Sequence, residues 1–340
     1  PAKAELVWQD AMNLVTDIKY NADSNGGNIS FKVDRSSIRQ GNAVIAIKDV
    51  SDAILWSWHV WVTDEDINNV IEITNHQNVK YNFMPVNLGQ CDGNTITYEE
   101  RSCKVKFIAG DQSKEITIKQ LANVIATGSN APFYQWGRKD PLYPSNGMGN
   151  TTKIWYDKEG IPSTANPMKG TFSAGNDCIK NCILNPNLMH NRYNGDYTYY
   201  NLWSADNKTT SANDNPVNKT IYDPCPVGFK LPASNAFTGF TTTGESVSSS
   251  TQVNGTWSSS EKGWYFYTNS EKTQSIFFPA LGYRSYSTMR PGSIGTQGCF
   301  WSAHPVAKGN NYYLRTSSVD VQPTYMVDRG FGYALRPCQD

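Results

Sequence analysis

The stretch TIYDPCPVGFKLP, residues 220–232, decides how the rest of the chain is interpreted. Its three prolines fix φ and remove backbone donors, and Gly228 permits a turn, so the stretch fits neither a helix interior nor a central strand. We expect a rigid, extended entry into a domain. If Cys225 pairs with Cys338 near the end of the chain, the disulfide closes a long loop. In the chain-entropy model it then adds about 4–5 kcal/mol to the free energy of unfolding.

Six further blocks accompany this stretch along the chain. They are ILWSWHVWVTD (54–64), NLG (87–89), FYQWGRKDP (133–141), FFPALGYR (277–284), CFWSA (299–303) and GFGYALRPC (330–338). In this order the blocks resemble the C-type-lectin-like major paralogous domain of Bacteroides and Fibrobacter surface proteins, which recurs in fimbrillin-type pilus-tip adhesins. The resemblance covers residues 54–338 and implies a C-type-lectin-like fold, mainly β with few short helices (α+β) and long loops.

The composition favours β structure and an extracellular protein. Aromatic residues make up 12% of the chain, and Asn, Ser, Thr and Gly are plentiful, a mixture that fits pleated strands and their turns. The formal net charge is zero, so bulk electrostatics predict no binding to nucleic acid. No apolar run approaches the ~18 residues that span a bilayer, and we expect no membrane span. Because the chain begins at Pro1, we interpret it as a processed product or fragment, secreted to the outer surface or fimbrium without its signal sequence.

The sequence divides into two parts. Residues 1–50 contain short alternating strands that are too few for a stable sheet, so we expect an N-terminal segment that packs on the next domain or belongs to a fimbrillin-like sandwich. Residues 51–340 are assigned to the lectin-like domain, with a β-hairpin inserted at about 91–130; a domain boundary near 130 is the alternative. Ile54–Val62 is apolar on both faces and is predicted to be a central strand.

Seven cysteines cannot all pair within one chain. The preferred disulfides are Cys91 with Cys103, clipping the inserted hairpin, and Cys225 with Cys338. Connectivity does not follow from sequence, and Cys178 and Cys182 remain open, either as a local pair or with other partners. Cys299 is expected to be a buried small hydrophobe.

No constellation of residues indicates catalysis. The four histidines are scattered, and neither CxxC nor HxxxH spacing occurs, so no metal site or cofactor is expected. Calcium motifs of animal-type lectins are absent, which leaves calcium-assisted glycan binding open but unsupported. Asp223 and Asp328 are interpreted as turn caps or ion-pair partners. The fold also resembles that of formylglycine-generating enzymes, which use a reactive cysteine pair, but Cys299 in GCFWS has neither charge nor exposure around it.

Two polar groups among tryptophans are assigned structural roles. His59 is expected to be a core histidine held by one or two hydrogen bonds, in preference to a ligand or general base. Arg138, Lys139 and Asp140, beside Trp136, are expected to form a partly buried ion-paired corner in which an arginine plane can stack on the indole, in preference to a binding clasp.

The C-terminal region carries the candidate ligand-binding site. Its residues are Trp301, His304, Tyr312, Arg315, Tyr325, Asp328 and Arg329, with Tyr313 beside them. Aromatic and arginine side chains anchor recognition because they offer large contact area and planar hydrogen bonding at modest entropy cost. We expect late loops and one strand's outer face to present them. The resemblance implies that this region is variable in the family and faces ligand; for each single residue, packing beneath a loop is the alternative.

These features together predict a non-catalytic cell-surface adhesin at a pilus tip. Its partner is expected to be a host or bacterial surface protein or glycan. The alternative is a structural pilus subunit or cap, because the strands of residues 1–50 invite pairing with other pilus subunits by strand donation. The third hypothesis, an oxidising enzyme of the formylglycine-generating type, requires a thiol with a lowered pKa.

Overall fold

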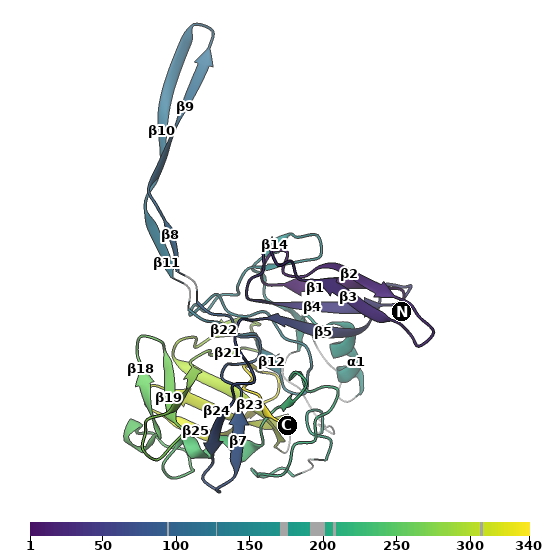
Figure 1. Ribbon diagram of the computed structural model, residues 1–340, viewed down its shortest axis with the longest axis vertical. Coiled ribbons are helices and arrows are strands. Elements are labelled where there is room, and N and C mark those ends of the chain that lie inside the picture. The colour runs from purple at the N-terminus through teal and green to yellow at the C-terminus, as the bar shows by residue number, and fades with distance from the viewer. Residues whose placement is uncertain (94, 127, 171–175, 191–200, 207–208, 307–308) are drawn as a thin grey trace.

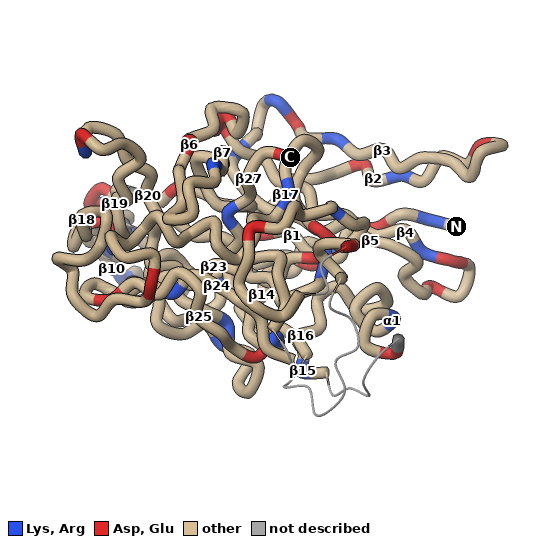
Figure 2. Tube along the Cα trace, turned by 90° about the horizontal axis from the view of Figure 1, so that it is seen from below, with Lys and Arg blue, Asp and Glu red and all other residues tan. Residues whose placement is uncertain are grey.

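The computed structural model describes residues 1–340 except 94, 127, 171–175, 191–200, 207–208 and 307–308. Strands make up 44% of the structure and helices 6%, which confirms the mainly β prediction. A body of small sheets carries a long, narrow projection, and the N-terminal strands lie at one side of the body (Figure 1). Lys and Arg positions and Asp and Glu positions are both scattered along the trace (Figure 2), and the formal net charge is zero.

The N-terminal strands form the largest sheet together with later segments. Its antiparallel order is β14 (Pro162–Ser163), β13 (Trp155–Tyr156), β1 (Lys3–Gln9), β4 (Gly41–Lys48) and β5 (Ile54–Val62). The sheet therefore crosses the predicted boundary at residue 50. β5 is its edge strand and contacts helix α1 (Asn176–Leu184), so the prediction of a central strand is wrong. An apolar pattern on both faces does not show that both edges are paired, and in β5 it does not show full burial either, since Leu55 is 41% and Trp58 42% exposed.

A hairpin covers one face of this sheet. Its strands are β2 (Thr16–Asn21) and β3 (Asn28–Lys32). Beneath it, Ala43 and Ile45 of β4 are buried with Leu14 and Val15, whereas Val44, which points to the opposite face, packs with Trp8 and Tyr143 of the body. The alternation expected for residues 43–47 thus gives β4 two different apolar neighbours.

The other sheets of the body are short. Two four-stranded sheets have the orders β17 (Phe229–Lys230)–β27 (Cys338–Gln339)–β7 (Lys80–Phe83)–β6 (Ile71–Thr74), and β12 (Tyr134–Gln135)–β26 (Gly332–Tyr333)–β21 (Tyr283–Arg284)–β22 (Pro291–Gly292). Two three-stranded sheets are β18 (Gly255–Ser258)–β19 (Gly263–Tyr267)–β20 (Ser275–Pro279), and β23 (Gln297–Pro305)–β24 (Asn310–Ser317)–β25 (Val321–Asp328). The rest are the parallel pair β15 (Met168–Gly170)–β16 (Leu188–His190) and the 3₁₀ helices η1 (Ser234–Phe240) and η2 (Ser250–Gln252).

The stretch 220–232 turns through its prolines and then enters β17. The carboxylate of Asp223 accepts the backbone N–H groups of Cys225, at 2.8 Å, and Leu231, at 3.0 Å, which confirms its assignment as a turn cap. β17 then pairs with the end of the chain, because Lys230 lies opposite Cys338 in the β17–β27 ladder. Backbone hydrogen bonds therefore join the two segments that the sequence suggested were stapled.

No disulfide makes that junction. Cys91, Cys103, Cys225 and Cys338 are free thiols in the structure, so the predicted pairs Cys225–Cys338 and Cys91–Cys103 are corrected. Cys225 and Cys338 are both buried. Cys91 is also buried, in an isolated bridge with Asn130, whereas Cys103 is exposed on the projection and lies opposite Ile118.

Buried side chains cover both faces of the three-stranded sheet β23–β24–β25. Phe300 and Leu314 belong to one aromatic core that includes Phe278. Trp301 and Tyr313, their neighbours in sequence, belong to a second core on the opposite face. Both faces of β23 and β24 are therefore buried under packed aromatic rings.

The hairpin predicted at about 91–130 is the projection in Figure 1, and we call residues 95–126 the arm. It consists of two consecutive antiparallel pairs, β8 (Thr95–Tyr98) with β11 (Asn123–Ala126) and β9 (Arg101–Ala109) with β10 (Gln112–Gln120). β9 and β10 extend away from the body, and their side chains are exposed apart from Val105, which is half-buried. The structure thus confirms the hairpin and removes its predicted disulfide clip.

Candidate functional site

The structure brings the predicted ligand-binding residues onto one sheet and the turn that follows it. Trp301 and His304 lie on β23, Tyr312 and Arg315 on β24, Tyr325 and Asp328 on β25, and Arg329 directly after β25. These residues cluster as the sequence suggested, but fewer of them are exposed than the sequence suggested.

Four of these residues are buried. Trp301 and His304 have no exposed surface, Tyr312 is 8% exposed and Arg329 is 4% exposed. The expectation that they form a surface patch is therefore wrong, because cores cover both faces of the sheet. Tyr313, at 4%, is buried with them.

Trp301 and Arg329 make their contacts inside the fold. The indole N–H of Trp301 donates to the carbonyl of Tyr134 at 2.8 Å. The guanidinium of Arg329 lies 4.2 Å from the ring centroid of Trp136, so the arginine that stacks on this indole comes from the end of the chain. Burial lowers the pKa of His304 to about 4, and the ring is neutral at physiological pH.

The remaining predicted residues are partly or fully accessible. Arg315 is ion-paired with Asp320 at 3.1 Å through Nη1. Asp328 accepts the backbone N–H of Gly330 at 2.7 Å, which confirms the turn-cap assignment. Tyr325 is 46% exposed and stands out as the accessible aromatic ring of this group.

A layer of buried rings supports Tyr325. Its ring lies 5.8 Å from that of Tyr313, which lies 4.7 Å from Tyr333, and Tyr333 lies 4.4 Å from Trp301. Offset and edge contacts of this kind fix ring orientation and add about 0.5–1.5 kcal/mol per pair beyond burial. Tyr325 is consequently held on a rigid base.

Three further half-buried aromatics join the same layer and were not identified from the sequence. They are Tyr283, Tyr286 and Phe331. Phe331 contacts Tyr286 at 4.7 Å, Tyr283 at 5.4 Å and Tyr333 at 5.7 Å between centroids. We call Tyr283, Tyr286, Tyr325 and Phe331 the aromatic face. The signal in the sequence was the aromatic content of GYRSY and GFGY, but only the fold joins these segments.

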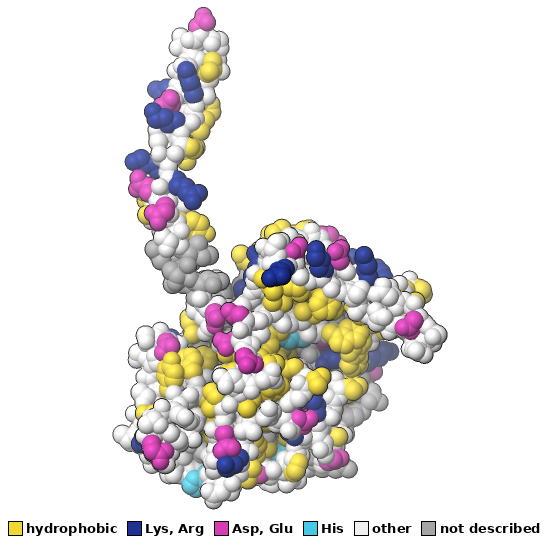
Figure 3. All heavy atoms as spheres, in the orientation of Figure 1, with side chains coloured by type: hydrophobic (Ala, Val, Ile, Leu, Met, Phe, Trp, Pro, Cys, Tyr) yellow, Lys and Arg dark blue, Asp and Glu magenta, His cyan; other side chains and the backbone are white. Residues whose placement is uncertain are grey.

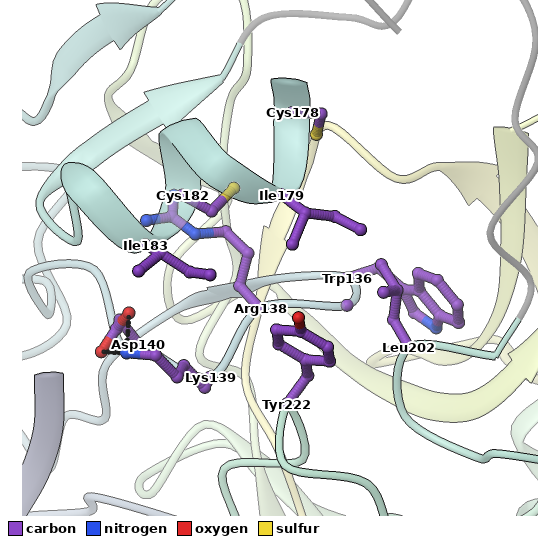
Figure 4. Close-up of a pocket in the computed structure, with 11 residues that line it drawn as sticks. Trp136, Arg138, Lys139, Asp140, Cys178, Ile179, Cys182, Ile183, Leu202 and Tyr222 are labelled. Atoms are coloured by element: carbon purple, nitrogen blue, oxygen red, sulfur yellow. Dashed lines mark hydrogen bonds and ion pairs between the residues drawn. The ribbon is translucent and has the colours of Figure 1, made fainter. Parts of the chain in front are cut away.

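The pocket in Figure 4 lies between α1 and the loop after β12. Its lining residues are Trp136, Gly137, Arg138, Lys139, Asp140, Cys178, Ile179, Cys182, Ile183, Leu202 and Tyr222. Its volume of about 20 Å³ accommodates about one water molecule. The pocket is therefore too small for a ligand.

The charged residues beside that pocket bond to groups within the fold. Lys139 contacts Asp140 at 2.7 Å and donates to the carbonyl of Ser57 at 2.9 Å, and its ammonium lies over the ring of Trp56. Arg138 donates to backbone carbonyls, including that of Pro186 at 2.9 Å. The ion-paired corner predicted from the sequence is confirmed.

His59 also has the predicted structural role. One ring nitrogen lies 2.9 Å from the side-chain oxygen of Asn42 and the other 3.0 Å from the hydroxyl of Tyr134. Loss of hydration lowers the pKa of His59 to about 3. Asn42 in turn donates to the buried carboxylate of Asp10 at 3.0 Å, and this carboxylate also contacts Lys153. The network links the N-terminal sheet to the body.

The thiols of Cys182, Cys225, Cys299 and Cys338 lack the setting of a reactive cysteine. Burial raises the pKa of Cys299 and of Cys338 to about 12, and burial is also the first cause that raises the pKa of Cys225. Cys178 and Cys182 lie one turn apart on α1, and the pKa of Cys182 is raised first by its hydrogen bond with Cys178 and then by burial. Cys299 is buried, as predicted from its surroundings.

No metal-binding group of three or more His, Cys, Asp or Glu side chains occurs among the residues that the structure describes. Within the same described ranges, no helix has the length and apolar character needed to cross a membrane. Comparison with protein-family models, curated proteins and solved structures gave no match to the chain. The resemblance to the lectin-like family therefore stays a prediction.

Proposed function

We propose that the chain is a non-catalytic cell-surface adhesin with a C-type-lectin-like domain, displayed at a pilus tip, which binds a host or bacterial protein or glycan through the aromatic face. The observation that carries the proposal is the set of partly exposed rings supported by buried ones. Tyr325 supplies the accessible ring, and Tyr313 and Tyr333 hold the layer beneath it.

The chemistry of the aromatic face suits recognition. Tyrosine presents a large apolar ring and a hydroxyl with few rotatable bonds, so binding costs little conformational entropy. A ring stacked on other rings is already ordered before the ligand arrives. The face therefore combines contact area, hydrogen-bonding capacity and preorganisation.

The protonation states support recognition over catalysis. His304 is neutral and enclosed, and the pKa values of the thiols of Cys225, Cys299 and Cys338 are raised. An oxidase of the formylglycine-generating type needs an accessible thiolate, which requires a lowered thiol pKa. We therefore rank the enzyme hypothesis last.

The test is binding of the purified chain to a broad glycan array and to immobilised extracellular proteins, with calcium and with a chelator. Tyr325→Ala combined with Phe331→Ala should reduce binding about tenfold or more, because truncated aromatic anchors typically cost at least 1–2 kcal/mol. Phe31→Ala is the matched control, since Phe31 on β3 is 43% exposed, against 46% for Tyr325. Unchanged binding by the double variant would move the site elsewhere.

The structural-subunit alternative has one observation in its favour. A groove of about 530 Å³ runs between β3 and β5, lined mainly by apolar side chains that include Phe31, Ile45, Trp58 and Val60. Both flanking strands are at sheet edges, which is the geometry that accepts an added strand. Concentration-dependent polymerisation that Phe31→Ala abolishes would favour this alternative over the adhesin.

A further inference from the structure

The arm has two chemically different faces. In the β9–β10 ladder, the cross-strand pairs on one face are Phe107 with Lys114, Val105 with Ile116, and Cys103 with Ile118. The pairs on the other face include Lys106 with Glu115 and Lys104 with Thr117, and Lys104 also forms an ion pair with Glu115 at 2.9 Å. Figure 3 shows hydrophobic side chains along one edge of the arm and Lys and Arg along the other. We call the first set the apolar face of the arm.

The apolar face has no cover within the described chain. Phe107 is 57% exposed, Ile118 53% and Ile116 44%, and the arm extends away from the body (Figure 1). A two-stranded hairpin is marginally stable on its own, and stability comes when an apolar face packs on another layer. Packing of a partner on this exposed apolar face would therefore stabilise the arm.

Cys103 lies on that face. It is the exposed cysteine of the chain, whereas the other six are buried or half-buried. An unpaired, exposed thiol among apolar side chains is uncommon on a free surface, because free cysteine behaves as a small hydrophobe. Its setting fits a surface that becomes covered.

We propose that the arm is a dimerisation element in which the apolar faces of two arms, from two copies of this chain, pack antiparallel about a twofold axis near Cys103. The charges along the arm are complementary in this arrangement. Lys114 pairs with Phe107, four residues from Cys103 towards the tip. Glu99 precedes Cys103 by four residues in the chain and lies between β8 and β9, on the side of the base. The twofold axis therefore brings Lys114 of one copy to the level of Glu99 of the second copy, at both ends of the contact.

The area of the apolar face sets the expected strength. At ~3.3 Å per residue and ~10 Å across two strands, residues 97–123 present ~400 Å² on one face, so two copies bury ~800 Å² in total. Specific stable interfaces bury ~1,200–2,000 Å², and weaker transient ones less. The dimer is consequently weak and depends on concentration, and it is independent of the ligand of the aromatic face.

A lipid bilayer suits this face less well than a second copy. Lys114 and Arg101 stand on the apolar face, six residues apart along the ladder, which is ~20 Å. The apolar band of a membrane-spanning β-barrel is ~25 Å tall, so an inserted arm would place a cation within it. A second copy instead offers Glu99 to Lys114. Arg101 comes to the level of Val105 of the second copy, where its long side chain can carry the charge past the edge of a face only ~10 Å wide.

The test is sedimentation velocity of the complete chain from micromolar to submillimolar concentration. Ile118→Lys on the apolar face should weaken self-association about tenfold or more, a loss that corresponds to one charge placed in a small apolar contact. Ile108→Lys is the matched control, because Ile108 lies on the opposite face of the same hairpin and is 69% exposed. Both positions are exposed in the single chain, so both variants should keep the wild-type melting temperature.

The charge arrangement is tested by a swap. Lys114→Glu should weaken the dimer, and adding Glu99→Lys should restore it, whereas Glu99→Lys alone should weaken it. A short bismaleimide, which joins two thiols by adding each across a maleimide double bond, should link Cys103 of two copies and should fail with Cys103→Ser.

Three results would overturn the proposal: a monomer at every concentration without Cys103 crosslinks, equal loss of association in Ile118→Lys and Ile108→Lys, or no rescue by the charge swap. Release of dye from phosphatidylcholine–phosphatidylglycerol vesicles by a monomeric chain, abolished by Ile118→Lys, would assign the apolar face to membranes instead.

Discussion

Acidification from pH 7 to pH 5 is expected to destabilise the protein, with His304 accounting for a defined part of the loss. His304 is fully buried, and burial lowers its pKa from 6.5 to about 4. Between these two values the unfolded chain binds a proton on this ring and the folded chain does not. Protonation of His304 therefore costs no stability above pH 6.5. As the pH falls below 6.5 the free energy of unfolding decreases, and this decrease is complete below pH 4. From pH 7 to pH 5 the loss is about 2 kcal/mol for this one group.

Urea denaturation of the wild type and of His304→Asn at both pH values measures this effect. The variant removes the titrating group, so its free energy of unfolding should fall about 2 kcal/mol less on acidification than that of the wild type. Any cost of the substitution at pH 7 is separate, because only the change between the two pH values is compared. His76→Asn, at an exposed position, is the control for a His-to-Asn replacement outside the core. If both variants lose the same free energy as the wild type on acidification, the assignment of His304 as a buried neutral ring is refuted.

Two further predictions concern the junction at the end of the chain. Arg336→Met should lower the free energy of unfolding by about 3–4 kcal/mol, because the buried guanidinium donates to the carbonyls of residues 84, 85 and 277 and to the Asn87 side chain, and removal leaves these acceptors without a donor. Arg290→Met, at an exposed position, should change it by less than about 0.5 kcal/mol, and equal effects in denaturant titrations would contradict this account. Cys225 and Cys338 should both react with a thiol reagent in the denatured, unreduced protein, and a mapped disulfide peptide joining them would show that the β17–β27 ladder has covalent support.

Periodicity predicted which segments are strands better than it predicted their neighbours. The alternation within residues 1–50 correctly gave short strands, and in one of them, β4, the structure buries Ile45 and Val44 in different clusters. The same reasoning made Ile54–Val62 a central strand, but β5 is at the edge. Side-chain patterns do not predict whether a strand lies at the edge of a sheet. Edge pairing depends on backbone N–H and C=O groups, which every residue type except proline carries alike.

The candidate site was predicted by residue type and corrected by burial. Leu314 and Thr316 of β24 are buried on one side of the sheet, and Tyr313, directly before Leu314, is also buried because a second core covers its face. Aromatic residues serve cores and recognition surfaces alike, so their identity cannot assign a side. Tyr283 and Phe331 meet only after β21 and β26 pair, a contact between segments distant in the sequence.

Cysteine spacing failed for a related reason. Cys91 and Cys103 are near in sequence, but one is enclosed beside Asn130 and the other lies out on the arm. Cys225 and Cys338 do lie in paired segments, since Lys230 is opposite Cys338. Sequence therefore indicated which segments meet at the end of the chain, whereas the interaction that joins them is a backbone ladder.

The two proposals have a joint consequence that neither has alone. A dimer joined through the arms would carry two aromatic faces, one on the body of each copy. The antiparallel arms between the two bodies would fix the distance between these faces. The second binding event on a surface would then be intramolecular, and avidity can exceed the affinity of one site by 10²–10⁴ when ligand spacing matches. Ile118→Lys should then leave binding to a sparse ligand surface unchanged and weaken binding to a dense one, whereas Tyr325→Ala with Phe331→Ala should weaken both. Equal losses on both surfaces for Ile118→Lys would mean that the arm contacts the ligand itself.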